Sequence, residues 1–401
     1  MLCAGLWNVA AAATLFAQAP PLKLTTLVND HATSLSLGPT GVLYGTASQA
    51  VFSITPPASP GGSWTGRVLY EFTGGSDGSL PNGLAIGSGP GGQTILYGTT
   101  LSGGSGGGGT VFSLTPPAGN SRSWTEKTLY SFTGDDGFNP RAGVVIGQGG
   151  ALYGTTGEGG TAGGNGTVFS LMPPAAAPDE PDGSWSETVL YSFDYNDGSG
   201  PGALAMDANG VLYGGTLAGG SSDRGTVFSL TPPVSPGGAW TEAVLHDFPS
   251  FAGDGWSPIT GLAVGGGGVL YGVTSKGGTS DFGIAYALTP PATSGGPWTE
   301  TLLHQFLAGA SDGLNPDCVS IIGNGVLLGA VAAGGRGAGG VFWLTPPDTP
   351  GGTWSETILR FPRNGHEGKS PASLVMGGDA IYGTTGEGGS KNRGTIFVLH
   401  P

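Results

Sequence analysis

Residues 94–132 read TILYGTTLSGGSGGGGTVFSLTPPAGNSRSWTEKTLYSF, and close variants of this stretch recur along the whole chain. The shared pattern is Leu-Tyr-Gly, a glycine-rich gap, Thr-Val-Phe-Ser-Leu-Thr-Pro-Pro, and then Trp-Thr-Glu before a short apolar run. The repeated position returns every 53 to 60 residues, at Tyr44, Tyr97, Tyr153, Tyr213, Tyr271, Leu328 and Tyr382. A regular period of this length predicts one supersecondary unit that is stacked seven times.

Each copy of the repeat predicts four short strands. In the second copy these are residues 83–87, 95–100, 110–115 and 124–132, which are rich in β-branched and aromatic residues and bounded by Gly, Pro or Asn. Four antiparallel strands are the content of one propeller blade, and seven copies lie within the usual range of about 4–8 blades. The sequence therefore predicts an all-β fold, a seven-bladed β-propeller.

The two ends of the chain predict how the ring closes. Residues 24–28 align with the fourth strand of the other copies, whereas residues 396–399 form a third strand with no fourth strand after it. One N-terminal strand and three C-terminal strands would complete the last blade, with the segment around Thr25 paired to the segment around Val398. Closure of this kind leaves no open blade edge. We therefore expect a single propeller domain over residues 22–401.

Residues that recur in every copy are interpreted as structural. The tryptophans should wedge between adjacent blades, and they are Trp64, Trp124, Trp185, Trp240, Trp298 and Trp354. The acid that follows most of them should blunt an exposed outer strand, at Glu126, Glu187, Glu242, Glu300 and Glu356. His246 and His304 occupy the repeat position that Tyr130 and Tyr191 occupy in other copies, so they should be packed strand residues.

A second recurring motif, Asp-Gly-x-x-Pro, precedes the first strand of most copies. Its acids are Asp77, Asp136, Asp197, Asp254 and Asp312. A ring of carboxylates could hold a divalent cation, because hard cations prefer oxygen ligands. Turn chemistry is the favoured interpretation: the Asp should bond the backbone two residues further on, and the Gly should take a positive φ. No metal and no cofactor are predicted. These loops should share one face of the ring with the Gly-Gly loops.

Composition limits the classes of function. The net charge is −14, which disfavours nucleic-acid binding, and no apolar run reaches the roughly 18 residues of a membrane span. Residues 1–19 contain an apolar, Ala-rich run followed by Ala17-Gln18-Ala19, so they are predicted to be a signal peptide. Only Cys318 would remain after its removal, which excludes an intramolecular disulfide and indicates a buried structural thiol. We expect an exported monomer.

Function in a repeat protein is sought where the copies differ. Five of the 13 Lys and Arg residues fall in loops of one face in the last two blades, together with His366 and Glu367. We therefore predict a binding site for an anionic or polyhydroxylated ligand, such as a polysaccharide. Its candidate residues are Arg336, Arg363, His366, Lys369, Lys391 and Arg393.

The repeat LYGTT, Gly-Gly, GTVFSLTPP, W(T/S)E and LYSF resembles the tandem-repeat "GloVer" proteins over essentially residues 22–401. The resemblance implies an exported bacterial propeller, extracellular or periplasmic. It supplies no catalytic residues. Family members carry various surface anchors, and this sequence, which ends in its last predicted strand, shows none.

Three functions remain open. The favoured one is a non-catalytic binding or scaffold module whose ligand is a polysaccharide or another protein. The second is a polysaccharide-acting hydrolase or lyase, which would need unique acids such as Glu158, Glu367 and Glu387 to converge at the channel mouth. The third is a purely structural surface protein.

Overall fold

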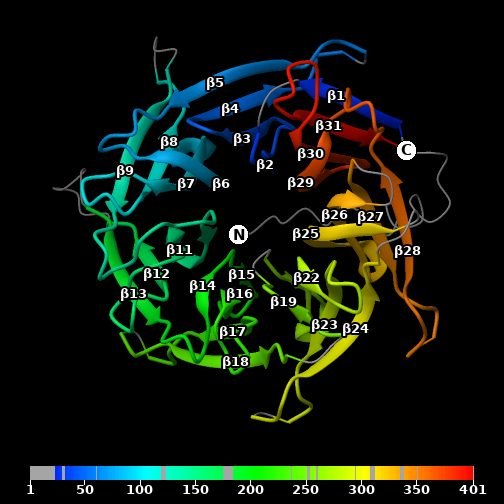
Figure 1. Ribbon diagram of the computed structural model, residues 1–401. Helices are drawn as coiled ribbons and strands as arrows, with labels where there is room; N and C mark the ends of the chain where they lie inside the picture. The colour runs from blue at the N-terminus through cyan, green and yellow to red at the C-terminus, as the bar shows by residue number, and fades with distance from the viewer. Residues whose placement is uncertain are drawn as a thin grey trace.

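The protein is known from a computed structural model, which describes residues 23–28, 32–59, 61–118, 123–174, 184–235, 237–250, 253–258, 261–293, 295–307, 312–334, 338–349 and 351–400. The described residues form seven blades around a central axis (Figure 1). Each blade is an antiparallel sheet whose strands follow one another from the axis outward. The predicted seven-bladed propeller is confirmed. No helix among these residues is both long enough and apolar enough to cross a membrane.

The strands of the first four blades have the following bounds. Blade one holds β2 (Ser34–Leu37), β3 (Leu43–Ala47), β4 (Ala50–Thr55) and β5 (Thr65–Glu71). Blade two holds β6 (Ser79–Ser88), β7 (Thr94–Ser102), β8 (Thr110–Thr115) and β9 (Thr125–Ser131). Blade three holds β10 (Val145–Ile146), β11 (Leu152–Thr156), β12 (Thr167–Met172) and β13 (Ser186–Ser192). Blade four holds β14 (Ser199–Pro201), β15 (Ala205–Met206), β16 (Leu212–Ala218), β17 (Thr226–Thr231) and β18 (Thr241–Asp247).

The remaining blades follow the same plan. Blade five holds β20 (Ala263–Val264), β21 (Leu270–Thr274), β23 (Ile284–Thr289) and β24 (Thr299–Gln305), with a short loop pair of β19 (Gly255–Trp256) and β22 (Lys276–Gly277). Blade six holds β25 (Gly313–Ile322), β26 (Val326–Gly334), β27 (Gly340–Thr345) and β28 (Ser355–Arg360). Blade seven holds β29 (Lys369–Gly377), β30 (Ala380–Glu387), β31 (Thr395–His400) and β1 (Lys23–Val28). Single 3-10 turns join inner strands at Pro90–Gly92, Gln148–Gly150, Gly266–Gly268 and Gly323–Gly325.

The ring closes as the sequence predicts. Strand β1 pairs antiparallel with β31, and Thr25 lies opposite Val398. The sheet order β1-β31-β30-β29 therefore makes the N-terminal strand the outer strand of the last blade. In Figure 1 the blue β1 lies beside the red β31. Because the chain ends are far apart in sequence, this pairing couples the first blade to the seventh.

The blades are held together by aromatic contacts across each interface. The tryptophan of one blade packs edge-on or tilted against the repeated tyrosine of the preceding blade, as Trp185 does against Tyr97, with ring centroids 5.6–6.5 Å apart. A phenylalanine that ends the outer strand packs similarly on the third strand of the next blade, as Phe132 does on Phe169 at 5.0 Å. Both rings of that pair are fully buried. The predicted wedging role of the tryptophans is confirmed.

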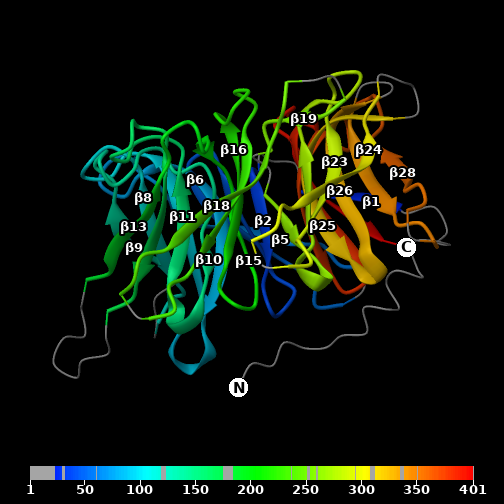
Figure 2. The same ribbon diagram turned by 90° about the horizontal axis from the view of Figure 1, so that it is seen from below.

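The Asp-Gly loops and the Gly-Gly loops lie together on one face, as predicted. The backbone N–H of Gly104 donates to the carbonyl of Gly75, and that of Gly160 donates to the carbonyl of Gly134, both at 2.9 Å. In blade five the same two loops form the β19–β22 pair, at the upper side of Figure 2. This face therefore presents two joined loops in blades two to five and in blade seven.

Candidate functional site

A polar cluster spans each of the five junctions from blade one to blade six. Each cluster combines a Tyr or His near the end of one outer strand, the Asp of the following loop, and the Glu on the outer strand of the next blade. We call these the junction clusters. They are Tyr70–Asp77–Glu126, Tyr130–Asp136–Glu187, Tyr191–Asp197–Glu242, His246–Asp254–Glu300 and His304–Asp312–Glu356.

The Asp of each Tyr-type cluster is held by donors that precede it in the chain. Asp77 accepts hydrogen bonds from the N–H of Thr73 at 2.8 Å, from the Thr73 hydroxyl at 2.6 Å and from the Tyr70 hydroxyl at 3.1 Å. Burial works to raise the pKa of Asp77, but the bonds from Thr73 and Tyr70 outweigh it and hold the pKa below its ordinary value. The Asp is therefore a well-stabilised carboxylate.

The predicted turn chemistry was only partly right. The Asp side chain reaches back to the end of the preceding strand instead of forward by two residues, because that strand supplies both a backbone N–H and a phenol. The following glycine has the predicted positive φ in four copies, with values of 93° to 139° at Gly78, Gly137, Gly198 and Gly368.

The interpretation of the repeated Glu as an edge-blunting charge is wrong. One carboxyl oxygen of each of four glutamates is buried and has no hydrogen-bond partner among the described residues, in Glu187, Glu242, Glu300 and Glu356. Burial, and then the neighbouring Asp, raises the pKa of each of these four carboxyls to about 7. Ionising two carboxyls that share a site is unfavourable, so each of these four Glu side chains keeps its proton to a higher pH than an isolated Glu does.

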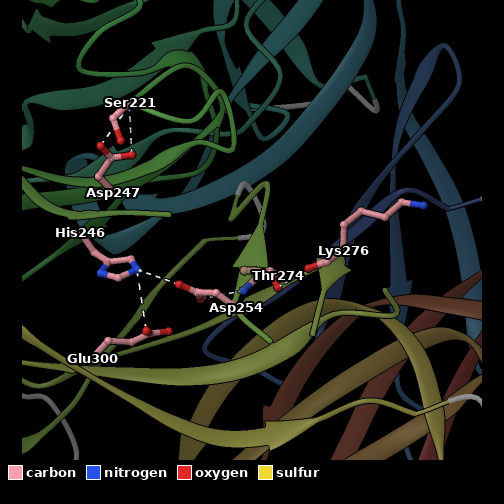
Figure 3. A network of polar contacts seen from close by, with 8 residues as sticks. Ser221, His246, Asp247, Asp254, Thr274, Lys276 and Glu300 are labelled. Carbon is pink, nitrogen blue, oxygen red and sulfur yellow. Dashed lines mark hydrogen bonds and ion pairs between the residues drawn. The ribbon is translucent and has the colours of Figure 1, made fainter. Parts of the chain in front are cut away.

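Two clusters differ because histidine replaces tyrosine. His246 Nε2 lies 3.8 Å from Asp254 Oδ2 and 3.8 Å from Glu300 Oε2. Figure 3 shows this ring nitrogen facing both carboxyls. In the second cluster His304 Nε2 lies 3.3 Å from an oxygen of Asp312 and 3.9 Å from one of Glu356. The imidazoles also stack edge-on against Phe248 and Phe306, so the packed role predicted for both histidines holds alongside these polar contacts.

The predicted basic residues fall into two neighbouring groups. His366 and Lys369 lie in and just after the loop that enters blade seven, whereas Lys391 and Arg393 lie in the loop between β30 and β31. A backbone bond of 2.7 Å from Gly389 N–H to the Gly365 carbonyl joins those loops.

The other two predicted residues lie on the blade-six side. Arg363 is exposed and, with Arg360, lines a hollow of about 370 Å³ formed by blade six and the segment that follows its outer strand. Arg336 lies outside the described residues. Arg360 was not among the predicted residues. Counted from Trp354 it falls in the Tyr/His slot, but the outer strand of blade six lacks the bulge of blades one to five, so Leu359 lies opposite Val341 where Tyr130 lies opposite Val111.

Arg393 also lines a larger groove, of about 970 Å³, between blades seven and one. The groove exists because the first copy departs from the repeat: Gly66 stands where other copies have Glu, and a two-residue turn, Ser48-Gln49, replaces the Gly-Gly loop. Its lining combines apolar Phe52 and Val68 with two cations, Arg67 and Arg393, and one carboxylate, Glu71. The groove is thus amphipathic and borders the loops that carry the predicted basic residues.

The central channel is a third hollow, of about 410 Å³, lined by the innermost segments of six blades. Its lining is mostly Gly, Ala and Ser, with Arg141 and Asp317 as the charged side chains. Burial raises the pKa of Asp317, and burial together with this carboxylate raises the pKa of Cys318 to about 12. Cys318 is only partly buried and lines this channel, so the prediction of a buried thiol is only partly right.

The three acids considered for catalysis come from two separate sectors of the ring. Glu158 belongs to blade three, where it accepts a 3.0 Å ion-paired hydrogen bond from Arg141. Glu367 and Glu387 belong to blade seven, where Glu387 lies opposite Lys369 in the β29–β30 pair. Two blades separate Glu158 from this pair on the shorter way around the ring (Figure 1).

A profile of the Gloeobacter/Verrucomicrobia repeat matches residues 29–249 and 234–401, which together span almost the entire ring. The chain belongs to the Gloeobacter/Verrucomicrobia repeat family. This agrees with the resemblance read from the LYGTT and TVFSLTPP segments. A search of curated proteins finds no match to this Gloeobacter/Verrucomicrobia repeat protein.

Solved structures similar to this Gloeobacter/Verrucomicrobia repeat protein share its fold at low identity. A catalytically inactive variant of virginiamycin B lyase from Staphylococcus aureus, with quinupristin, is 15% identical, with a TM-score of 0.55, and the match covers 95% of this chain and 99% of that one. PorZ of the type-IX secretion system of Porphyromonas gingivalis is 13% identical, with a TM-score of 0.57, over 96% of this chain and 48% of that one. The extracellular domain of BT3049 from B. thetaiotaomicron is 12% identical, with a TM-score of 0.53, over 95% and 41%. These neighbours include an enzyme and a surface component, so the fold alone does not distinguish an enzyme from a non-catalytic surface protein.

Proposed function

We propose that this protein is an exported, non-catalytic binding module that holds an anionic polysaccharide on its loop face at the last and first blades. The observation that carries the proposal is the position of Arg393, which both borders the groove and belongs to the loop that carries Lys391. In a chain of net charge −14, cations that converge on one groove provide a local attraction for anions.

The groove offers more than charge. Val68 is 53% exposed in its wall, and apolar surface beside a few polar groups is the usual lining of ligand sites. A sugar polymer could place its ring faces on this surface and its carboxylates near Arg393 and Arg67. A Cβ added to Gly66 would meet nothing within 4 Å, so the groove is open at the position where the repeat normally carries Glu.

The test uses surface plasmon resonance with immobilised polygalacturonate as the anionic probe and dextran as the neutral one. The double variant Arg363→Glu/Arg393→Glu should lose about tenfold in affinity for polygalacturonate, since each exposed charge contributes roughly 0.2–1 kcal/mol and reversal doubles the change. Gly66→Glu should weaken binding independently by restoring the repeat's acid inside the groove.

Lys127→Glu is the matched control, because Lys127 is an exposed cation on the outer strand of blade two. This variant should bind like the wild type. Wild-type affinity in the Arg363→Glu/Arg393→Glu variant would refute the proposed site, and equal affinity for dextran would refute the anionic ligand. Export is tested separately: the mature protein recovered from the producing cell should begin at Pro20.

A further inference from the structure

The His-type junction clusters place three metal-ligating side chains within reach of one point. In each, the candidate atoms of His, Asp and Glu all lie within 4.8 Å of one another. Donor atoms held about 2.0–2.2 Å from a tetrahedral ion lie about 3.3–3.6 Å apart. The measured separations from His Nε2, 3.3 to 3.9 Å, are therefore close to those of a coordinated set.

Unpartnered buried atoms mark the first of these clusters as incomplete. His246 Nε2 and Glu300 Oε1 are buried and have no hydrogen-bond partner among the described residues. At 3.8 Å, the carboxyl oxygens are too distant to bond that nitrogen. In the Tyr-type clusters the phenol hydroxyl instead donates a hydrogen bond directly to the Asp carboxylate, over 3.1 Å from Tyr70 and 2.5 Å from Tyr130. Buried polar atoms are normally satisfied, so the open nitrogen of His246 indicates a missing partner.

Asp254 is oriented in a way that leaves one oxygen available. In other copies the residue after the conserved Phe donates its backbone N–H to the Asp, as Leu307 does to Asp312 at 2.8 Å. The corresponding residue here is Pro249, which has no N–H to donate. The Gly255 N–H holds Asp254 Oδ1 at 2.7 Å, and Oδ2 faces His246. A backbone bond to one oxygen is the kind of contact that orients a metal-binding carboxylate.

Sequence departures concentrate at this same junction. Tyr286 replaces the phenylalanine found at its position in most blades, and its hydroxyl is fully buried without a hydrogen-bond partner among the described residues. Burial, followed by the charges of Glu300 and Asp254, raises the pKa of Tyr286. Tyr286 is therefore another polar group placed near these carboxyls.

We propose that His246, Asp254 and Glu300, and their copies His304, Asp312 and Glu356, each bind a first-row divalent transition-metal ion such as Zn²⁺. One imidazole nitrogen and two carboxylate oxygens form a ligand set that suits Zn²⁺ and its neighbours, whereas Ca²⁺ and Mg²⁺ favour all-oxygen sites. Because His and Glu come from the outer strands of adjacent blades, the ion would tie blade four to five and blade five to six. Metal that binds only the folded ring stabilises it.

The Tyr-type clusters of the same chain suggest substitutions that remove the metal ligand and should preserve folding. His246→Tyr and His304→Tyr rebuild the Tyr–Asp–Glu arrangement that blades one to four already use, so both variants should fold. Tag-free protein is equilibrated with Zn²⁺ at about pH 8, because metal binding requires deprotonated ligands. Bound metal is then measured after dialysis, and Co²⁺ absorption spectra report coordination by the protein.

The wild type should hold two metal ions per chain, each single variant one, and the double variant none. Zn²⁺ should raise the melting temperature of the wild type and leave that of the double variant unchanged. His366→Ala, which removes an exposed loop imidazole, should keep both ions. A wild type without bound metal, or a double variant that keeps the wild-type stoichiometry, would overturn the proposal. If His246→Tyr loses one ion and His304→Tyr loses none, the result would support the site at His246 and overturn the site at His304.

Discussion

Replacing Glu187 and Glu242 by Gln should remove part of the pH dependence of this protein's stability. Both carboxyls lie in Tyr-type clusters, and burial first, then the neighbouring Asp, raises the pKa of each to about 7. Gln preserves the shape of the neutral side chain but cannot ionise. The double variant should therefore behave like the protonated wild type at every pH.

The direction in which stability changes with pH follows from proton linkage. In the unfolded chain a Glu carboxyl loses its proton near pH 4.5, whereas in the folded protein Glu187 and Glu242 keep it until about pH 7. The folded state therefore binds more protons between these values, and wild-type stability falls as pH rises through this window. The stabilisation is fully present below the unfolded pKa and is lost above the folded one.

The magnitude can be worked out from the same shift. A rise of about 2.5 pKa units corresponds to about 3.4 kcal/mol for a fully enclosed group. Both side chains are only half-buried, so solvent screening reduces this to about 1 kcal/mol each. Two such groups amount to about 2 kcal/mol, or a melting temperature about 2–3 °C higher for the variant at alkaline pH in a chain of this size.

The assay is thermal unfolding followed by circular dichroism at about pH 5 and about pH 8.5, in chelator so that metal does not contribute. The wild type should melt lower at the higher pH, and the double Gln variant should show a smaller decrease. Glu71→Gln, at an exposed position on the outer strand of blade one, is the control and should leave the decrease unchanged. Equal decreases in the wild type and the double variant would refute the assignment of protonated carboxyls to these junctions.

Three further predictions concern the ring itself. A chain that lacks β1, or that carries Thr25→Pro, should lose the pairing with β31 and melt well below the wild type or aggregate, as calorimetry and light scattering would show. Trp185→Ala should destabilise the protein by about 2–3 kcal/mol in urea unfolding, because the half-buried indole leaves its edge-on contact with Tyr97. Cys318 should react with a thiol reagent at native pH much more slowly than a free cysteine does, since its surroundings raise its pKa to about 12; labelling at the rate of a free cysteine would contradict this.

The architecture was predictable because its determinants are local and repeated. Alternating apolar residues fix each strand, and the repeat period fixes the number of blades. The pairing of Thr25 with Val398 followed because one end of the chain lacks a fourth strand while the other end supplies one. The Trp contacts followed as well, since a large aromatic residue at a fixed place in every blade has to be buried between blades.

The junction clusters were not predictable from the same pattern. Tyr130, Asp136 and Glu187 come from two successive copies, and only the rotation of one blade against the next brings them together. Considered alone, a Glu after Trp on an outer strand has the pattern of a solvent-exposed charge. The sequence did offer one signal, a difference between copies. His replaces Tyr in two consecutive blades, and in the first of them Pro249 stands where other copies have a residue whose backbone N–H bonds the Asp.

The repetition of one blade interface around the ring makes departures from the repeat the best guide to function here. Seven similar interfaces mean that each altered one can be compared with unaltered neighbours in the same chain. Gly66, in place of the repeated Glu, opens a groove that a charged side chain would occupy elsewhere. His246, in place of the repeated Tyr, leaves a buried nitrogen that a phenol would have avoided. These two departures are therefore the positions at which the proposed ligand and the proposed ion are tested most directly.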